Sequence, residues 1–330
     1  MVDLKKLKTN LSDEKTKRKL LVASGNFGYK FFRFLLLSSM CFIILYPVIY
    51  MFSVAIRQSV DLYDPTVIWI PKHFTLDNFS LVIETLDYFK LLVNTLWYSA
   101  VSTLLSVASC ALAGYGFARF NFKFKGLLFT LLLFTIIVPP QIVSIPLYLQ
   151  YADFDFFGIT AIIKSISGAD FKINLLDTPL TLFIPALLGA GLRSGFLIYV
   201  FRQFFRGMPA ALEDAAYIDG CGVFSTFLKI IVPNASGSFL VVSLLSFVWY
   251  YNDYFFTSMY FSKVPTVSVG LASLQGMLRA AVEGDQNADP YSIIAQMQAG
   301  CLLAIIPLTI AFLFLQKKFI KSIESSGIVG

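Results

Sequence analysis

Residues 213–233 read EDAAYIDGCGVFSTFLKIIVP, and this stretch is the most informative part of the chain. A short small-residue helix is expected to end at Gly220, because glycine readily forms the left-handed turn that stops a helix. Nine residues separate Gly220 from an Ile-Ile-Val-Pro sequence that begins at residue 230 and ends at Pro233. The stretch lies between two long apolar segments, and a polar helical hairpin of this kind is not a membrane span. It predicts a loop outside the membrane that another protein binds.

The composition indicates a membrane protein. Charged residues make up 14% of the 330 residues, hydrophobic residues 57%, and the mean hydropathy is +0.73. Ordinary soluble domains carry about 25% charged residues. The four cysteines form no C-x-x-C pair and are expected to be free thiols. The chain has one histidine, His73, so we expect no histidine-based catalytic residue and no metal site.

Uncharged stretches of sufficient length predict six transmembrane helices and an all-α integral membrane fold. About 20 apolar residues are needed to cross the hydrocarbon core of a bilayer. The expected spans lie in residues 34–56, 91–118, 126–152, 178–201, about 234–260, and 290–316. Pro139, Pro140 and Pro146 interrupt the third span, either as a hinge or as an irregular helix end.

The loops alternate in charge, which predicts the orientation. Lysine and arginine dominate the first tail, the 119–125 turn, the 202–232 loop and the C-terminal tail. The loops 57–90, 153–177 and 261–289 are neutral or acidic and are expected to be extracytoplasmic. Cytoplasmic loops carry an excess of positive charge, so both termini and the 213–233 loop are expected to be cytoplasmic. The formal charge of +6 is therefore a topology signal, and no nucleic-acid partner is expected. The expected organisation is a cytoplasmic arm 1–33, a first span 34–56, an extracytoplasmic loop 57–90, a five-span core 91–316 with a cytoplasmic loop 206–233, and a tail 317–330.

The loop has a readable local pattern. Pro209 suits the first position of a helix. Leu212, Ala215, Ala216 and Asp219 recur at the spacing of one helical face, and the two alanines let another protein approach the backbone closely. A second apolar helix is expected over 223–232. On the local pattern alone, a passive cytoplasmic hairpin remains an alternative.

The loop resembles the EAA loop of ABC importer permeases, in which E-A-A, three residues and glycine precede an I-x-L-P sequence. Further motifs resemble the maltose-transporter type of carbohydrate-uptake permease, and together they cover about residues 70–330. They are Asn94-Thr95, Leu112 to Phe120, Val138 to Gln141, Ile145 to Tyr148, Arg202 to Arg206 with Pro209, Trp249 with Asn252-Asp253, and Leu271 to Gly276. Two positions depart from the pattern: Asp214 replaces the glutamate, and Cys221 stands where alanine is frequent.

The resemblance implies a type I importer permease fold and a role for each part of the loop. It implies that Glu213, Asp214, Ala215, Ala216, Asp219, Gly220 and Pro233 couple the permease to its ATPase. It also implies ABC ATPase subunits that bind ATP and magnesium, a second homologous permease, an extracytoplasmic sugar-binding protein, and a bacterial cell membrane with its lipid as the setting. This chain itself is expected to bind no cofactor.

Polar residues inside the spans have two interpretations. Tyr250, Tyr251, Asn252 and Asp253 suit a sugar pathway, because aromatic rings stack on sugars and polar groups bond their hydroxyls. Asp253 also suits helix packing, and that alternative is favoured. Arg193 is expected to be paired or to extend toward the membrane surface. Gln275, in the family-like segment before the last span, is a candidate contact for the binding protein.

The absence of one motif separates the function classes. The chain has no G-x-x-x-x-G-K-[ST] sequence, so its energy must come from a separate ATPase. The first hypothesis is therefore a permease subunit of a sugar importer. The alternative is an ion-gradient-driven carrier or channel, for which buried charged chains and internal repeats are expected. A membrane enzyme is not expected, because the sequence shows no convincing combination of a nucleophile and a base.

Overall fold

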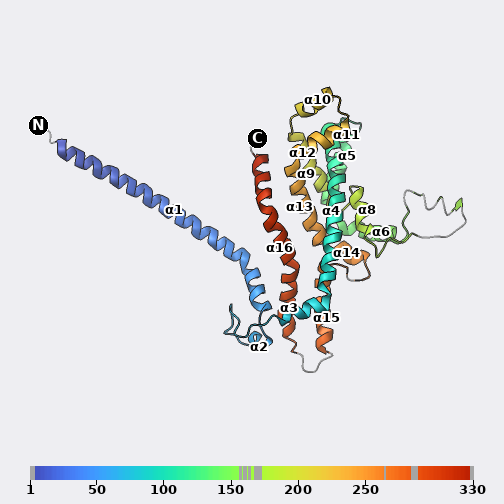
Figure 1. Cartoon of the computed structure of the whole chain (residues 1–330), viewed down its shortest axis with the longest axis horizontal. Coiled ribbons are helices and arrows are strands. Elements are labelled where there is room, and N and C mark those ends of the chain that lie inside the picture. The colour runs from blue at the N-terminus through green and yellow to red at the C-terminus, as the bar shows by residue number, and fades with distance from the viewer. Residues whose placement is uncertain are drawn as a thin grey trace.

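The computed structural model describes the backbone of residues 4–155, 158, 162, 165–166, 173–263, 265–283 and 289–327. Side chains are described from residue 29 to 317 within these ranges. The regular elements of this described part are helices (Figure 1). Part of the expected 153–177 outer loop lies outside the described residues.

Three of the expected spans are continuous helices. They are α1 (Leu4–Ala55), α4 (Tyr88–Arg119) and α16 (Ser292–Gly327). In α1 the segment Tyr29–Ala55 is long and apolar enough to cross a membrane. The uninterrupted apolar runs that predicted these spans therefore correspond to long helices, each beginning or ending close to a charged residue.

The third and fourth expected spans are broken. The third becomes α5 (Lys125–Ile137) and α6 (Pro140–Ala152), which meet at an angle of 98°. Pro139 disfavours a helical conformation at Val138, whose ψ of 122° is extended. The fourth becomes α8 (Leu180–Leu187) and α9 (Ser194–Gly207), separated by an irregular segment.

The fifth expected span is also divided. It consists of α13 (Ser236–Tyr251) and the short α14 (Phe255–Tyr260), and α13 is bent by 81° from the preceding helical segment Val223–Asn234. By length and composition, the described residues hold three helices able to cross a membrane, or up to five if each bent pair is one span. The predicted number of six is therefore not confirmed, because the fourth span consists of two helices too short to qualify.

One end of the bundle carries additional helices in two of the three regions predicted as extracytoplasmic loops, 57–90 and 261–289. They are α2 (Ser59–Leu62), α3 (Asp77–Leu86) and α15 (Val267–Glu283), which lie together at the lower end of the molecule in Figure 1. Buried residues from α1, α3, α4, α15 and α16 form one core here, including Val82, Leu91, Leu274 and Ala299. This end is thus a packed helical cap.

The single histidine takes part in this cap. His73 Nδ1 lies 2.7 Å from Asp61 Oδ1, and the backbone N–H groups of Lys72 and His73 donate to Asp61 Oδ2. Burial opposes ionisation of Asp61, but the hydrogen bonds from the His73 backbone and ring and from Lys72 lower its pKa overall. The contacts of His73 thus hold the loop after α2 in place.

The opposite end carries the 213–233 segment. It contains α10 (Ala211–Ile218), α11 (Val223–Thr226), a π-helical turn η1 (Phe227–Ile231) and α12 (Val232–Asn234). A second core joins this end to α4, α9 and α13 and includes Tyr115, Phe201, Phe205 and Phe227. In Figure 1, α10 lies beyond the upper ends of these helices.

Candidate functional site at the 208–234 segment

The helix α10 is fixed to the bundle by one of its faces. Glu213 and Ala216 are buried, whereas Ala211, Asp214, Ala215 and Ile218 are exposed. The exposed positions follow the spacing of one helical face, and Ile218 keeps 86% of its surface exposed. The sequence predicted Ala215 and Ala216 on a common outer face. The structure corrects this, because Ala216 points into the chain's own core and only Ala215 faces outward.

Glu213 forms a buried ion pair across the bundle end. Its Oε1 lies 2.9 Å from Nε of Arg119, the last residue of α4, and both side chains are largely buried. The Nη2 of Arg119 also donates to the backbone carbonyl of Met208, at the end of α9. In the sequence, Arg119 is one residue of the family-like motif from Leu112 to Phe120. Its pairing with Glu213 joins positions 94 residues apart and has no local signal in the sequence.

Gly220 ends α10 as predicted. Its φ of +80° is left-handed, the Gly220 N–H donates to Tyr217 O, and the Cys221 N–H donates to Ala216 O. These two bonds are the pattern of a Schellman C-cap, which favours glycine at this position. An added Cβ at Gly220 would find no atom within 4 Å, so only the backbone conformation demands glycine here. Asp219 is exposed beside it.

The expected second helix over 223–232 is present but irregular. The Val232 N–H donates to Phe227 O, five residues earlier, which defines the π-helical turn. Pro233 follows at once, and its missing N–H and ring are incompatible with a regular helical ladder. Proline and a widened turn therefore act together to redirect the chain into α13.

The aromatic residues expected in the substrate pathway are mostly structural. Tyr250 and Tyr251 are buried. The Tyr250 hydroxyl lies 3.0 Å from Ser106 Oγ of α4 and accepts the Leu192 N–H from the break between α8 and α9. The Tyr251 hydroxyl donates to the carbonyl of Ala304 on α16. Both rings thus hold helices together, and Tyr250 also satisfies irregular backbone within a broken span.

Asp253 caps the short helix α14. Its Oδ2 accepts hydrogen bonds from the Thr257 N–H and the Thr257 hydroxyl, at 2.8 and 2.7 Å. This is the usual role of aspartate before a helix. These contacts are local to the start of α14, so they show neither the sugar contact nor the packing between two helices that the sequence suggested. The neighbouring Asn252 and Tyr254 are exposed.

Arg193 contacts an aromatic ring. It has a φ of +52° just before α9, and its guanidinium carbon lies 4.9 Å from the centre of the Trp249 ring. Its side chain is exposed, and no carboxylate lies within ion-pair distance among the described residues. A cation over an indole ring is a favourable contact, so Arg193 is held by Trp249 instead of by an acid.

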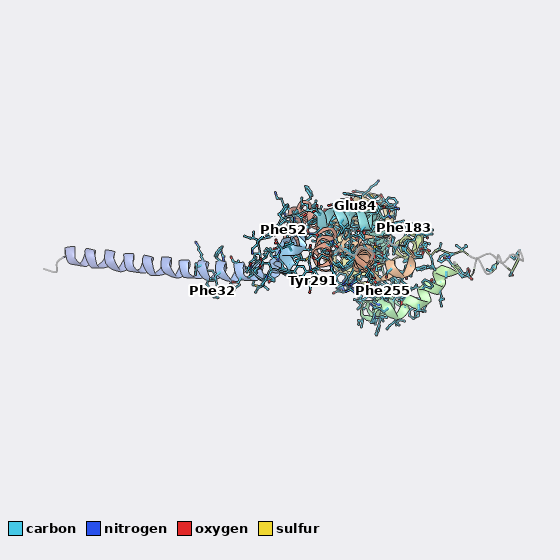
Figure 2. The ribbon with its side chains drawn as sticks, turned by 90° about the horizontal axis from the view of Figure 1, so that it is seen from below. Phe32, Phe52, Glu84, Phe183, Phe255 and Tyr291 are labelled. Carbon is cyan, nitrogen blue, oxygen red and sulfur yellow. The ribbon has the colours of Figure 1, made fainter. Side chains whose placement is uncertain are left out.

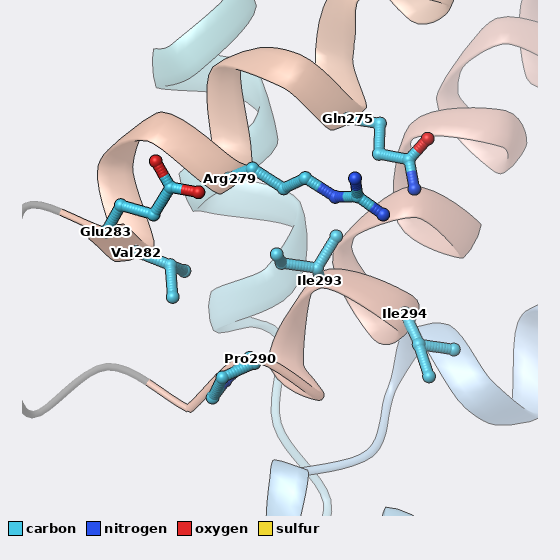
Figure 3. A pocket seen from close by; sticks show the side chains of 7 residues that line it. All are labelled: Gln275, Arg279, Val282, Glu283, Pro290, Ile293 and Ile294. Atoms are coloured by element: carbon cyan, nitrogen blue, oxygen red, sulfur yellow. The ribbon is translucent and has the colours of Figure 1, made fainter.

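Gln275 lies at the opposite end of the molecule, on α15. It is exposed and lines a cleft of about 430 Å³ with Arg279, Val282 and Glu283 of the same helix and Pro290, Ile293 and Ile294 near the start of α16 (Figure 3). Figure 3 shows the Arg279 side chain extending toward Gln275 and Ile293. The predicted contact residue is thus part of a helix and a concave surface, whereas the sequence placed it in the loop before the last span.

Comparison with known proteins identifies the family of this chain. Residues 106–325 match the family described as binding-protein-dependent transport system inner membrane component. The chain belongs to this family. The motif resemblance is thereby confirmed, and the chain is a membrane component of a transport system and not an enzyme.

This permease is also similar in sequence to two known permeases and in fold to one solved structure. Over 265 residues it is 30% identical to the melibiose/raffinose/stachyose import permease MelC of Bacillus subtilis, covering 79% of this chain and 84% of MelC. Over 294 residues it is 26% identical to the arabinooligosaccharides permease AraQ of Halalkalibacterium halodurans, covering 88% and 92%. Its fold matches a chain in the crystal structure of a bacterial ABC transporter involved in alginate import, with a TM-score of 0.63, 19% identity, and coverage of 88% and 96%. The permease fold is thus confirmed.

Proposed function

We propose that this permease is one of two homologous subunits forming the membrane pathway of a carbohydrate importer. A separate pair of ATPase subunits binds ATP and magnesium and drives transport, and an extracytoplasmic binding protein delivers the sugar. The relatives support the substrate class, because MelC and AraQ carry names of oligosaccharide permeases. Family membership argues against the alternative of an ion-gradient-driven carrier.

The proposed coupling to the ATPase is supported by helix α10, which has one buried face and one exposed face. Its inner face is pinned by Glu213 and Ala216, while its outer face presents small residues, one carboxylate at Asp214 and the exposed Ile218. An isoleucine with 86% of its surface in water gains by entering an apolar pocket of a partner. The positive-inside argument puts this face in the cytoplasm, where an ATPase is found.

Replacing Ile218 tests this docking face. Ile218→Glu is expected to abolish co-purification of the ATPase while the permease stays in the membrane, because the side chain makes little contact with its own chain. The matched control is Ile70→Glu, since Ile70 is also 81% exposed but lies in the predicted extracytoplasmic loop. Pull-down of the tagged permease from membranes, with ATPase quantified, gives the readout. Full ATPase retention by Ile218→Glu contradicts the proposed face.

The cleft around Gln275 is proposed as part of the surface that meets the binding protein. It combines an amide, a guanidinium and apolar walls at the predicted outer end. Gln275→Ala is expected to weaken the stimulation of ATP hydrolysis by the binding protein, with basal hydrolysis unchanged. Glu84→Gln, at an exposed position on α3, is the control. Equal stimulation in both variants means that Gln275 has no part in docking.

A further inference from the structure

The coupling helix α10 is linked to the bundle in two ways, by its chain connections and by one buried ion pair. Its connections are short irregular segments, residues 208–210 before it and 219–222 after it. The ion pair joins Glu213 in its first turn to Arg119 in the last turn of α4, with 2.9 Å between Nε and Oε1. An acid near a helix N-terminus and a cation near a C-terminus each interact favourably with the helix dipole, so both partners occupy suitable positions.

Because both side chains are buried, each charge depends on the other for compensation. The Arg119 and Glu213 side chains keep 14% and 9% of their surface exposed. A buried carboxylate that loses its cation is an uncompensated charge and has to be protonated or moved into water. Protonation removes the attraction that holds the first turn of α10 against α4, and a move into water carries that turn away from α4. The hydrogen bond from Arg119 to Met208 O adds the end of α9 to the same junction.

Helix α4, which bears Arg119, can transmit a displacement along its length. α4 has 32 residues without a break, a length of about 48 Å, whereas the third, fourth and fifth expected spans are interrupted. Toward its other end, Tyr88 donates to the Leu303 carbonyl of α16, and Thr95 accepts the Val267 N–H of α15. A displacement of the Arg119 end therefore acts on helices at the opposite end of the molecule.

We infer that the Arg119–Glu213 pair is a latch that passes movement of the coupling helix directly to α4. This inference rests on the proposed ATPase coupling and adds a division of labour between adjacent acids. Asp214 faces outward toward the ATPase, and Glu213 faces inward to the permease's own α4. Arg119 and Glu213 are positioning residues that touch neither ATP nor sugar.

The test uses the full importer complex in liposomes, with Cys41, Cys110, Cys221 and Cys301 replaced by serine and a reporter Leu96→Cys on α4. Leu96 is 38% exposed, so a thiol there can be labelled. Three quantities are measured for each variant: ATPase retained, ATP hydrolysed, and the change in reporter labelling when ATP is added. The Arg119→Gln and Glu213→Gln variants are expected to retain the ATPase and to hydrolyse ATP. The change in reporter labelling on addition of ATP is expected to be about tenfold smaller than in the wild type.

Two further variants separate a latch from a general folding role. Arg119→Lys preserves the charge and is expected to recover part of the labelling response. The single variants Arg119→Glu and Glu213→Arg are expected to lose the ATP-dependent labelling change. The double variant that combines them, the exchanged variant, restores opposite charges and is expected to recover part of that change. Arg206→Gln, at an exposed cation at the end of α9, is the matched control and should behave as wild type.

Each outcome has a distinct meaning. A normal ATP-dependent labelling change in Arg119→Gln overturns the latch while leaving the proposed function intact. Loss of ATPase retention in Arg119→Gln, with no recovery in the lysine and exchanged variants, also overturns it, since the pair then only folds the loop. A wild-type complex that retains no ATPase overturns the proposed function, and the latch with it.

Discussion

Gly220 shows how a single backbone angle can matter for coupling. Its φ of +80° and its two capping hydrogen bonds set the direction in which the chain leaves α10. Gly222, two residues later, has an ordinary φ of −73°. Neither glycine has any atom within 4 Å of the position of an added Cβ. The two glycines therefore differ in backbone strain and not in available space.

This difference makes a prediction about two alanine variants. Gly220→Ala is expected to cost about 1 kcal/mol in the local turn and to lower transport per ATP hydrolysed, because the left-handed conformation is unfavourable for a residue with a Cβ. Gly222→Ala is expected to behave as wild type. Uptake and ATP hydrolysis are compared at equal membrane abundance. Equal losses in the two variants would show that the φ of Gly220 has no role in coupling.

At the scale of the element, α10 separates structural from docking functions by its two faces. Ala216 retains only 5% of its surface exposed, whereas Ala215 beside it is exposed. Adjacent alanines with the same volume thus meet different surroundings. One packs inside this chain, and the other is available to a partner.

Leucine substitutions at these positions distinguish the two faces. Ala215→Leu is expected to prevent docking of the ATPase with little change in the permease's own stability, since it adds bulk only to the outer face. Ala216→Leu is expected to destabilise the permease by roughly 1–3 kcal/mol through overpacking. Thermal unfolding in detergent and ATPase co-purification measure the two effects. If Ala216→Leu left stability unchanged while blocking ATPase binding, the sequence-based assignment of this face would be correct and the structural one wrong.

The same elements show what the sequence could and could not predict. Unbroken apolar runs predicted α1, α4 and α16, and glycine chemistry predicted the turn at Gly220. The break before α9 was missed, because Gly189 and Arg193 adopt positive φ values held by contacts from distant helices. α3 and α15 were missed as helices because they lie in loops defined only by charge. Polar residues have several uses, so the sequence suggested a sugar ligand or a helix-packing residue at Asp253 and missed the local cap that it forms with Thr257.

At the scale of the whole molecule, a large apolar surface has no partner within this chain. Every residue of α1 from 29 to 50 is exposed, and Figure 2 shows Phe32 on the part of this helix that extends away from the bundle. α5 has no buried residue. Lipid or a further subunit can cover such surfaces, and they are therefore compatible with the proposed pairing of two homologous permeases.

The proposed orientation is open to a direct test, because it rests on loop charges and α10 and α15 lie at opposite ends of the molecule. In a variant without native cysteines, Ala211→Cys on α10 is expected to react with a membrane-impermeant thiol reagent only after the cells are opened. Ile70→Cys, 81% exposed at the other end, is expected to react in intact cells. The lysines and arginines of the 119–125 turn and the 202–232 loop favour this orientation, since translocating those cations is unfavourable. Labelling of Ala211→Cys in intact cells would place the coupling helix outside, away from any cytoplasmic ATPase, and would end both the topology and the coupling proposals.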